Sequence, residues 1–295
     1  MCVNIKRHGD WTQKDYFAYP ALSNSDLKLM VDSPRKLRAK LDGDLPFTVT
    51  EPMSLGSAYD DYVLSPHLFN ERWDVVDVGD MPTTDNQKEF CRLIVAGFEP
   101  DEAIGKAYKK APMTGEQMYA LYSGWIRMMV GGSDMISDAS MHTIRTMHAN
   151  LERHEHAMRV IEDSDHQVCF TGIHEETGVE VKGMLDMLSK DGVYETDLKV
   201  TSTQRAKING WWIKDRMYDT QRAMYGALSG ARRSGFLVCE SIAPHESYLI
   251  DYTDHMEYAY NRLNNLIVEY DWRQKNGFWE RSMEYHTNGG WETIR

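Results

Sequence analysis

Residues 183–201, GMLDMLSKDGVYETDLKVT, decide the fold expected for this chain. Two short apolar-rich runs flank Ser-Lys-Asp-Gly, a turn signal whose glycine can adopt a positive φ. The upstream run HQVCFTGIH, at residues 166–174, is also strand-like, and a second turn signal, EETG, follows it. These three runs predict a three-stranded antiparallel meander that carries acidic side chains inside its strands.

Side chains alternate faces along a strand, so Glu195, Asp197 and Lys199 are expected on one face. If residues 189–192 form the turn, Asp186 pairs with Glu195 and lies diagonal to Asp197, at roughly 7–8 Å between backbones. Two such carboxylates raise each other's pKa, and a divalent cation between them removes the repulsion. The pattern therefore favours a Mg²⁺ site beside Lys199, which could orient a water for attack on phosphorus.

The same residues also fit a plainer interpretation, a solvent-facing strand with an Asp–Lys pair. The helix expected at residues 213–228 bears on this choice, because Gln221 and Tyr225 lie one turn apart on its apolar stripe. The stripe consists of Met217, Gln221, Met224, Tyr225 and Leu228. A glutamine on a buried face needs hydrogen-bond partners, so Gln221 is either a satisfied core residue or a contact to a phosphate or base.

The remaining segments predict helices and two further strands. Helices are expected near residues 23–31, 35–41, 55–65, 140–163 and 255–274, a mostly helical region at 71–136, and strands at 235–243 and 246–253. This order predicts an α/β fold with a mixed central β-sheet flanked by helices and a helical N-terminal elaboration. We expect one domain over 1–295, with an N-terminal arm (1–20), a mainly helical part (21–163), a core (164–253) and a C-terminal helix and tail (254–295).

Composition indicates an ordinary globular protein, with 42% apolar and 26% charged residues. No run approaches the roughly 18 apolar residues of a membrane span, and the N-terminus lacks the apolar segment of a secretory signal. The four cysteines form no C-x-x-C pair, which argues against a zinc ribbon, a cysteine-ligated cluster and a disulfide framework. We therefore expect a cytoplasmic protein with no membrane partner.

The net charge of −12 at first argues against a nucleic-acid partner. Phosphate binding depends on local potential, however, and an acidic protein can carry a basic groove. Basic clusters occur at residues 35–40, 106–110 and 232–233. Each such cluster is more often simply a solvated helix face, so charge alone does not decide whether DNA is a partner.

The order of motifs resembles the PD-(D/E)XK nucleases, and most closely the exonuclease VIII (RecE) type, with lambda exonuclease more distant. The matching motifs are G-x-x-D at 183–186, D-x-K at 197–199 and Y-x-x-Q-x-x-x-Y at 218–225. The N-terminal segments ALSNSDLKLMVDSPRKL and MSLGSAYDDYVLSP also resemble that family's opening. The resemblance runs discontinuously from about residue 20 to 250 and implies a restriction-endonuclease-like core.

Residue by residue, the resemblance implies that Asp186 and Asp197 bind Mg²⁺ or Mn²⁺ and that Lys199 is the catalytic lysine. Gln221 and Tyr225 match the Q-x-x-x-Y motif, which lies beside the active site of those nucleases and contacts DNA. In this interpretation a water attacks phosphorus in line while Lys199 positions it.

Two positions depart from the family pattern. Asp60 stands where many relatives have a histidine; it is either a third metal ligand or a surface acid of its helix. His166 and Gln167 stand where relatives usually have a glutamate, a carboxylate that Asp60, Glu162 or Asp165 could replace. Alternatively, the metal is bound weakly and the protein is a poor or specialised nuclease.

The expected function is a metal-dependent exonuclease acting on double-stranded DNA ends. The resemblance further implies phage recombination or DNA processing in a bacterial or phage-infected cell, a homo-oligomer, and a recombination partner protein. Three alternatives stay open: an endonuclease or single-strand-specific nuclease, a catalytically weak protein that binds DNA or a protein partner, and a structural protein. The iron–sulfur branch of the fold is disfavoured, because four scattered cysteines do not suit a cluster.

Overall fold

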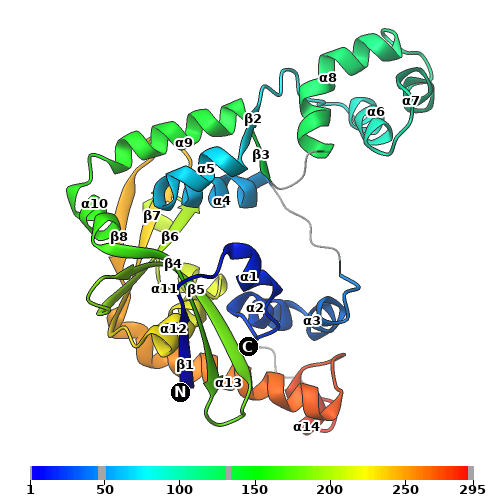
Figure 1. Cartoon of the computed structure of the whole chain (residues 1–295). Helices are drawn as coiled ribbons and strands as arrows, with labels where there is room; N and C mark the ends of the chain where they lie inside the picture. Colours follow the sequence, from blue (N-terminus) through cyan, green and yellow to red (C-terminus); the bar gives the residue numbers. More distant parts are fainter. Residues whose placement is uncertain (1, 46–50, 131–133, 292–295) are drawn as a thin grey trace. The chain divides into compact units, whose positions relative to one another are not determined.

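The structure is a computed structural model that describes residues 2–45, 51–130 and 134–291 (Figure 1). The chain divides into two compact units, each with its own hydrophobic core. The sheet unit consists of Met1–Thr48 and Asn150–Arg295, and the helical unit of Val49–Ala149. The interpretation of 1–295 as one domain stays a prediction, and the ends of that range, residues 1 and 292–295, lie outside the described residues.

A six-stranded sheet forms the centre of the sheet unit. In spatial order its strands are β1 (Cys2–His8), β4 (Ser164–His174), β5 (Glu180–Ser189), β6 (Tyr194–Thr201), β7 (Arg233–Glu240) and β8 (Ser247–Asp251). Neighbouring strands are antiparallel except β6 and β7, which are parallel. The mixed sheet and the β4–β5–β6 meander confirm the predicted α/β fold, whereas β1 lies in the segment predicted as an arm.

The parallel pairing of β6 and β7 requires the chain to cross back over the sheet. Helices α11 (Gly210–Asp215) and α12 (Tyr218–Ser229) make this crossover, and α12 packs on β4, β5 and β7 beside helix α13 (Met256–Asn276) (Figure 1). The prediction of one helix over 213–228 is wrong, because Met217 adopts a left-handed φ of 55° that separates α11 from α12.

Helices α2 (Asn24–Asp32) and α3 (Pro34–Leu41) begin as the sequence predicts. Ser23 caps α2: the Asp26 amide donates to its hydroxyl at 3.3 Å, and the Asp26 carboxylate accepts from its amide at 2.8 Å. Asn24 ties α2 to the start of α12, because its Nδ2 donates to the Met217 carbonyl at 3.2 Å and its Oδ1 accepts from Thr220 at 2.7 Å. The N-terminal helices therefore belong to the same core as the sheet.

The turn between β5 and β6 is longer than predicted. Leu188 pairs with Glu195, so the predicted register is wrong by two residues. The Asp191 carboxylate accepts from the Ser189 hydroxyl at 2.6 Å and the Val193 amide at 3.0 Å, which holds Val193 in the loop. A shift of two residues keeps the β6 side chains on their predicted faces. Continued beyond the Met187–Thr196 pair, this register would set Asp186 opposite Asp197 instead of diagonal to it.

Strand β5 is irregular at Asp186. Gly183 faces α12, since a Cβ there would lie 2.9 Å from the Tyr225 ring. Leu188 faces the same helix, because its cross-strand partner Glu195 contacts Arg222 of α12. These two β5 positions are an odd number of residues apart, so regular alternation is interrupted between them. On β4 the residue opposite Asp186 is Gln167, whose φ of 50° lies in the left-handed region.

The rest of the chain is mainly helical. The sheet unit also contains α1 (Gln13–Ala18), α14 (Met283–Thr287) and the 3₁₀ turns η2 (Arg205–Lys207) and η3 (Thr253–His255). Helix α9 (Asp138–Leu151) ends before α10 (Glu155–Glu162) begins, so the single helix predicted over 140–163 is wrong. His154 separates the two helices because its Nδ1 caps α10, accepting from the Ala157 amide at 3.1 Å.

The helical unit contains a short parallel strand pair that the sequence did not predict. Its elements are α4 (Glu51–Leu64), α5 (Pro66–Arg72), β2 (Asp74–Val76), α6 (Asp85–Val95), α7 (Pro100–Ala107), α8 (Gly115–Val130), β3 (Met135–Ser137) and most of α9. Helices α6, α7 and α8 form a core around Phe90, Met118 and Tyr122. Asp61 on α4 is buried and accepts from Arg72 and Trp73 at 3.0 and 2.8 Å.

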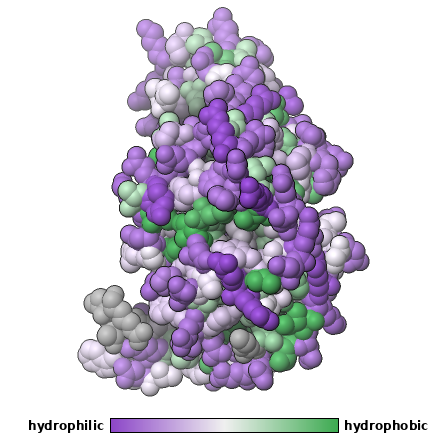
Figure 2. All heavy atoms as spheres, turned by 90° about the vertical axis from the view of Figure 1, so that its left-hand side faces the viewer, coloured by the Kyte–Doolittle hydropathy of each residue, from purple (hydrophilic) through white to green (hydrophobic). Residues whose placement is uncertain are grey.

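None of the described helices is long and apolar enough to cross a membrane. Figure 2 shows one face of the molecule, on which hydrophilic residues dominate and hydrophobic residues gather in small areas.

Candidate active site

Asp186 lies where β5 and β6 separate. The Leu198 amide donates to its Oδ2 at 2.9 Å, so the carboxylate takes a position that a backbone carbonyl would occupy in a regular ladder. Surrounding protein atoms and then the nearby Asp197 charge raise the pKa of Asp186 to about 7, although part of the side chain still meets solvent. Near neutral pH the carboxyl is therefore poised between its two protonation states.

Asp197 and Lys199 form an ion pair on the same face of β6. The Lys199 ammonium contacts Asp197 Oδ2, which is buried and has no hydrogen bond of regular geometry. Burial alone would lower the pKa of Lys199, but the Asp197 and Asp186 carboxylates outweigh burial and raise it. The ammonium also lies 4.8 Å from the centre of the Tyr218 ring. Lys199 is therefore a fixed positive charge at the site.

Arg222 on α12 closes the buried side of the site, and sequence reasoning missed it. Its guanidinium is fully buried, donates to Asp197 Oδ1 at 2.6 Å and contacts Glu195 Oε2. Ser234 donates to the other oxygen of Glu195, and burial raises the pKa of Glu195 to about 7. The one available signal was that α12 has an arginine directly after Gln221, on a helix predicted to be buried.

Gln221 and Tyr225 contact each other on the helix that carries Arg222. Gln221 Nε2 donates to the Tyr225 hydroxyl at 3.0 Å, and Gln221 is partly exposed whereas Tyr225 is buried. The Tyr225 ring packs on Gly183, where a Cβ would come within 2.9 Å of it. The glycine of G-x-x-D therefore allows α12 to lie close to β5, and this close packing positions the Gln–Tyr pair.

The remaining predicted ligands are carried by other elements. Asp60 is partly exposed on α4 and belongs to the helical unit. Asp165 pairs with Arg7 of β1 at 2.7 Å, and Glu162 is exposed at the end of α10. His166 contacts the Ile161 carbonyl through Nε2 at 2.9 Å. Within the sheet unit, the structure thus brings together Asp186, Asp197 and Lys199 with Gln221 and Tyr225 nearby.

The donor chemistry of Asp186 and Asp197 fits a hard divalent cation. Carboxylate oxygens are its preferred ligands, and burial followed by the nearby Asp197 charge raises the pKa of Asp186, so a further cation would favour its ionised form. Among residues 2–45, 51–130 and 134–291, no cluster of three or more His, Cys, Asp and Glu side chains is placed to hold a metal. A Mg²⁺ ion needs only one or two carboxylates, so the pair suffices.

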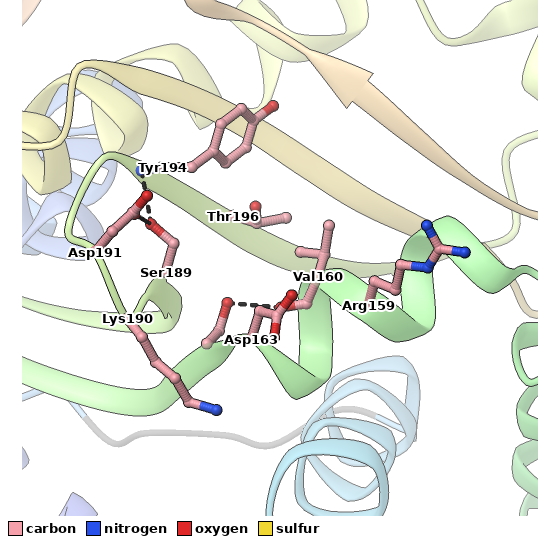
Figure 3. Close-up of a pocket in the computed structure, with 9 residues that line it drawn as sticks. Arg159, Val160, Asp163, Ser189, Lys190, Asp191, Tyr194 and Thr196 are labelled. Carbon is pink, nitrogen blue, oxygen red and sulfur yellow. Dashed lines mark hydrogen bonds between the residues drawn. The ribbon is translucent and has the colours of Figure 1, made fainter.

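A cavity of about 430 Å³ lies near this sheet but away from the site (Figure 3). It is lined by α10 and by the β5–β6 turn, with Thr196 from β6. Thr196 and Asp197 are neighbours in one strand and therefore face opposite sides of the sheet. The basic residues of the cavity, Arg159 and Lys190, are matched by Asp163 and Asp191, so its charge favours no particular ligand.

Comparisons with known proteins identify a family and a shared fold. The model of the family described as "PDDEXK-like domain of unknown function (DUF3799)" matches residues 23–284. The chain is similar to a solved structure, "Putative exonuclease" from Eubacterium rectale, with 17% identity, 98% of this chain and 96% of that chain covered, and a TM-score of 0.59. At this identity the similarity shows the fold alone.

Two further solved structures match less well. The protein SSO0001 has 13% identity, coverage of 72% of this chain and 85% of that chain, and a TM-score of 0.28. Protein VC1899 from Vibrio cholerae has 13% identity, coverage of 87% and 58%, and a TM-score of 0.20. Scores this low do not indicate a shared fold. No curated protein matches the chain.

Proposed function

The chain belongs to the PDDEXK-like family DUF3799, and from this premise we propose that it is a divalent-metal-dependent deoxyribonuclease, acting as an exonuclease on DNA ends. The observation that carries the proposal is the convergence of Asp186, Asp197 and Lys199 at the point where β5 and β6 separate. The name of the Eubacterium rectale protein, whose fold is shared, also supports an exonuclease. A role in phage recombination is part of the same proposal.

In the proposed reaction, water adds to phosphorus and one phosphodiester P–O bond breaks, leaving a phosphate monoester and a hydroxyl. Asp186 and Asp197 would hold Mg²⁺ or Mn²⁺, which supplies Lewis-acid stabilisation of charge on the phosphoryl oxygens. Lys199 remains an ammonium because the two carboxylates raise its pKa, so it acts as a hydrogen-bond donor to the water or phosphoryl oxygen and not as a base.

Gln221 and Tyr225 are the proposed strand contacts. The Tyr225 hydroxyl accepts a hydrogen bond from the Gln221 side-chain amide, which fixes the direction of both polar groups. Gln221 is the more exposed of the two and would contact the DNA backbone directly. Tyr225 is buried and would act by orienting Gln221.

The test is degradation of end-labelled linear duplex DNA with Mg²⁺ or Mn²⁺, with closed circular DNA as the control substrate. An exonuclease degrades the linear DNA alone, and Lys199→Ala abolishes this degradation. Cutting of the circle would indicate an endonuclease instead. If neither metal supports degradation at high enzyme concentration and low salt, the catalytic proposal is wrong.

A second candidate function is DNA binding without cleavage, which the position of Arg222 favours. The Arg222 guanidinium donates a hydrogen bond to Asp197 Oδ1, and the Lys199 ammonium contacts Oδ2, so two cations already neutralise this carboxylate. Such neutralisation weakens the attraction of Asp197 for a metal ion. A protein of this kind would bind DNA equally well in the presence of a chelator and would leave end-labelled DNA intact.

A further inference from the structure

The loop and short helix after β6 carry an exposed aromatic side chain among basic residues. Trp211 is 72% exposed, an unusual fraction for the largest apolar side chain. The segment 204–216, QRAKINGWWIKDR, contains Arg205, Lys207, Lys214 and Arg216 but only one acid, Asp215. This positive segment stands out in a chain whose net charge is −12.

The position of Trp211 is fixed by its neighbours. Asn209 Oδ1 accepts from the backbone amides of Trp211 and Trp212, both at 3.0 Å, and so caps helix α11. Trp212 is buried in the core, and its Nε1 donates to Thr203 at 3.3 Å. One tryptophan thus anchors the segment while the adjacent one is presented to solvent.

This segment is contiguous with the candidate active site. The Trp212 ring lies 5.2 Å from the Tyr218 ring, and the Lys199 ammonium lies 4.8 Å from that same ring. Lys28 on α2 is exposed and lies near Lys199 and Arg216, because burial and then repulsion from these two cations lower its pKa. The α11 segment is therefore joined to Lys199 through the Trp212 and Tyr218 rings.

The basic side chains of the segment are available to a ligand. Arg205, Lys207 and Lys214 are exposed, and none of them forms an ion pair with an acidic residue in the part of the chain that the structure describes. The Arg205 guanidinium donates to the Ile208 carbonyl at 3.3 Å and lies 5.1 Å from the centre of the Tyr248 ring, contacts that leave its charge unneutralised. Lys214 lies 4.0 Å from the centre of the Tyr258 ring, which orders its ammonium without neutralising it. Exposed cations beside an aromatic ring are the combination that binds single-stranded nucleic acid, where phosphates meet the cations and bases stack on the ring.

We propose that Trp211 stacks on an unpaired nucleobase of the DNA strand bound at the Asp197–Lys199 site, while Arg205, Lys207 and Lys214 contact its phosphates. The inference rests on the proposed function, which supplies the DNA strand, and it specifies that strand as one with accessible bases. In a duplex the base faces are covered by their neighbours, so Trp211 favours single-stranded DNA or a frayed end.

The experiment measures binding of the full chain to a fluorescein-labelled oligothymidylate by anisotropy, in a chelator so that no cleavage occurs. The variants are Trp211→Ala, Trp211→Phe and the matched control Trp291→Ala, which removes a tryptophan that is 77% exposed outside the segment. The second ligand is the same strand built from abasic units, which keeps the phosphates and removes the bases.

Stacking predicts that Trp211→Ala weakens binding of oligothymidylate about tenfold. Trp211→Phe should retain most of the affinity, Trp291→Ala should leave it unchanged, and wild type and Trp211→Ala should bind the abasic strand equally. Unchanged affinity of Trp211→Ala for oligothymidylate, or an equal loss on the abasic strand, overturns the stacking role and leaves the nuclease proposal intact. Absence of oligothymidylate binding by wild type also overturns the stacking role, whereas the nuclease proposal fails only if linear duplex stays intact with both metals.

Discussion

Arg222 and Asp197 form a fully buried ion pair between helix α12 and strand β6, with 2.6 Å between the guanidinium and Oδ1. The same guanidinium contacts Glu195 and lies 4.7 Å from the centre of the Tyr225 ring. One side chain therefore connects the crossover helix to both acids of β6. This connection holds the Asp197 and Lys199 side chains of β6 in position relative to the Gln221–Tyr225 pair, because α12 also carries that pair.

Replacing Arg222 by Met is expected to destabilise the fold by about 3–5 kcal/mol, because buried Glu195 loses its cation and Asp197 loses one of its two. Adding Glu195→Gln to Arg222→Met should recover part of this loss, since one uncompensated charge is removed. Denaturant unfolding of the metal-free protein measures both effects. Similar stability of wild type and Arg222→Met would mean that the pair contributes little.

Replacing Lys199 by Ala is expected to lower the rate of DNA hydrolysis on the order of 10²–10³-fold, the typical effect of removing one donor that stabilises transition-state charge. The control is Lys190→Ala, because Lys190 lies in the β5–β6 turn and donates to the Glu162 carbonyl. That variant should keep wild-type activity. Equal losses in both variants would point to a general effect of charge on DNA binding.

Replacing Gly183 by Ala is expected to cost about 1–3 kcal/mol, because the new methyl group would lie 2.9 Å from the Tyr225 ring. Gly105→Ala is the control: Gly105 lies in α7 with open space around its Cβ position, and Ala should be neutral or stabilising there. Thermal unfolding compares the two variants. A neutral Gly183→Ala would show that α12 shifts on β5 without cost.

The metal-free protein is expected to lose stability as pH rises from about 4 to about 7. The folded-state pKa values of Asp186 and Glu195 are raised to about 7, so both carboxyls hold protons in the folded state that the unfolded chain releases. The folded state therefore binds more protons in this range, and the free energy of unfolding falls with pH until it levels off above about 7.

Unfolding in denaturant across this pH range measures the slope. Asp186→Asn should make the slope shallower, and an excess of Mg²⁺ should offset the loss above pH 7 if the ion binds the ionised pair. A stability that rises with pH in the same range would contradict the pKa directions.

Replacing Gln167 by Glu is expected to raise Mn²⁺ affinity by about tenfold, because it adds a third carboxylate opposite Asp186. Isothermal titration calorimetry measures the affinity, and Asp186→Asn in the Gln167→Glu background serves as the control that removes the gain. If Gln167→Glu leaves affinity unchanged, the residue 167 side chain does not reach the metal.

Local periodicity was sufficient to predict much of this protein. Alternation within residues 166–201 identified the three strands of the meander, and the four-residue spacing of Gln221 and Tyr225 placed them one turn apart on one helix face, where the structure shows them in contact. The face shared by Asp197 and Lys199 also followed from alternation, because it depends only on neighbours within one strand. These features are determined by residues close in the chain.

Tertiary structure decided the rest. The β5–β6 register depends on the bonds of Asp191 inside the turn, and the irregularity of β5 at Asp186 lies opposite the left-handed backbone of Gln167 on β4. The role of Arg222 required the parallel pairing of β6 with β7, which carries α12 over the two acids. Such pairings join residues far apart in sequence, and a local sequence pattern does not predict which of them has the lowest free energy.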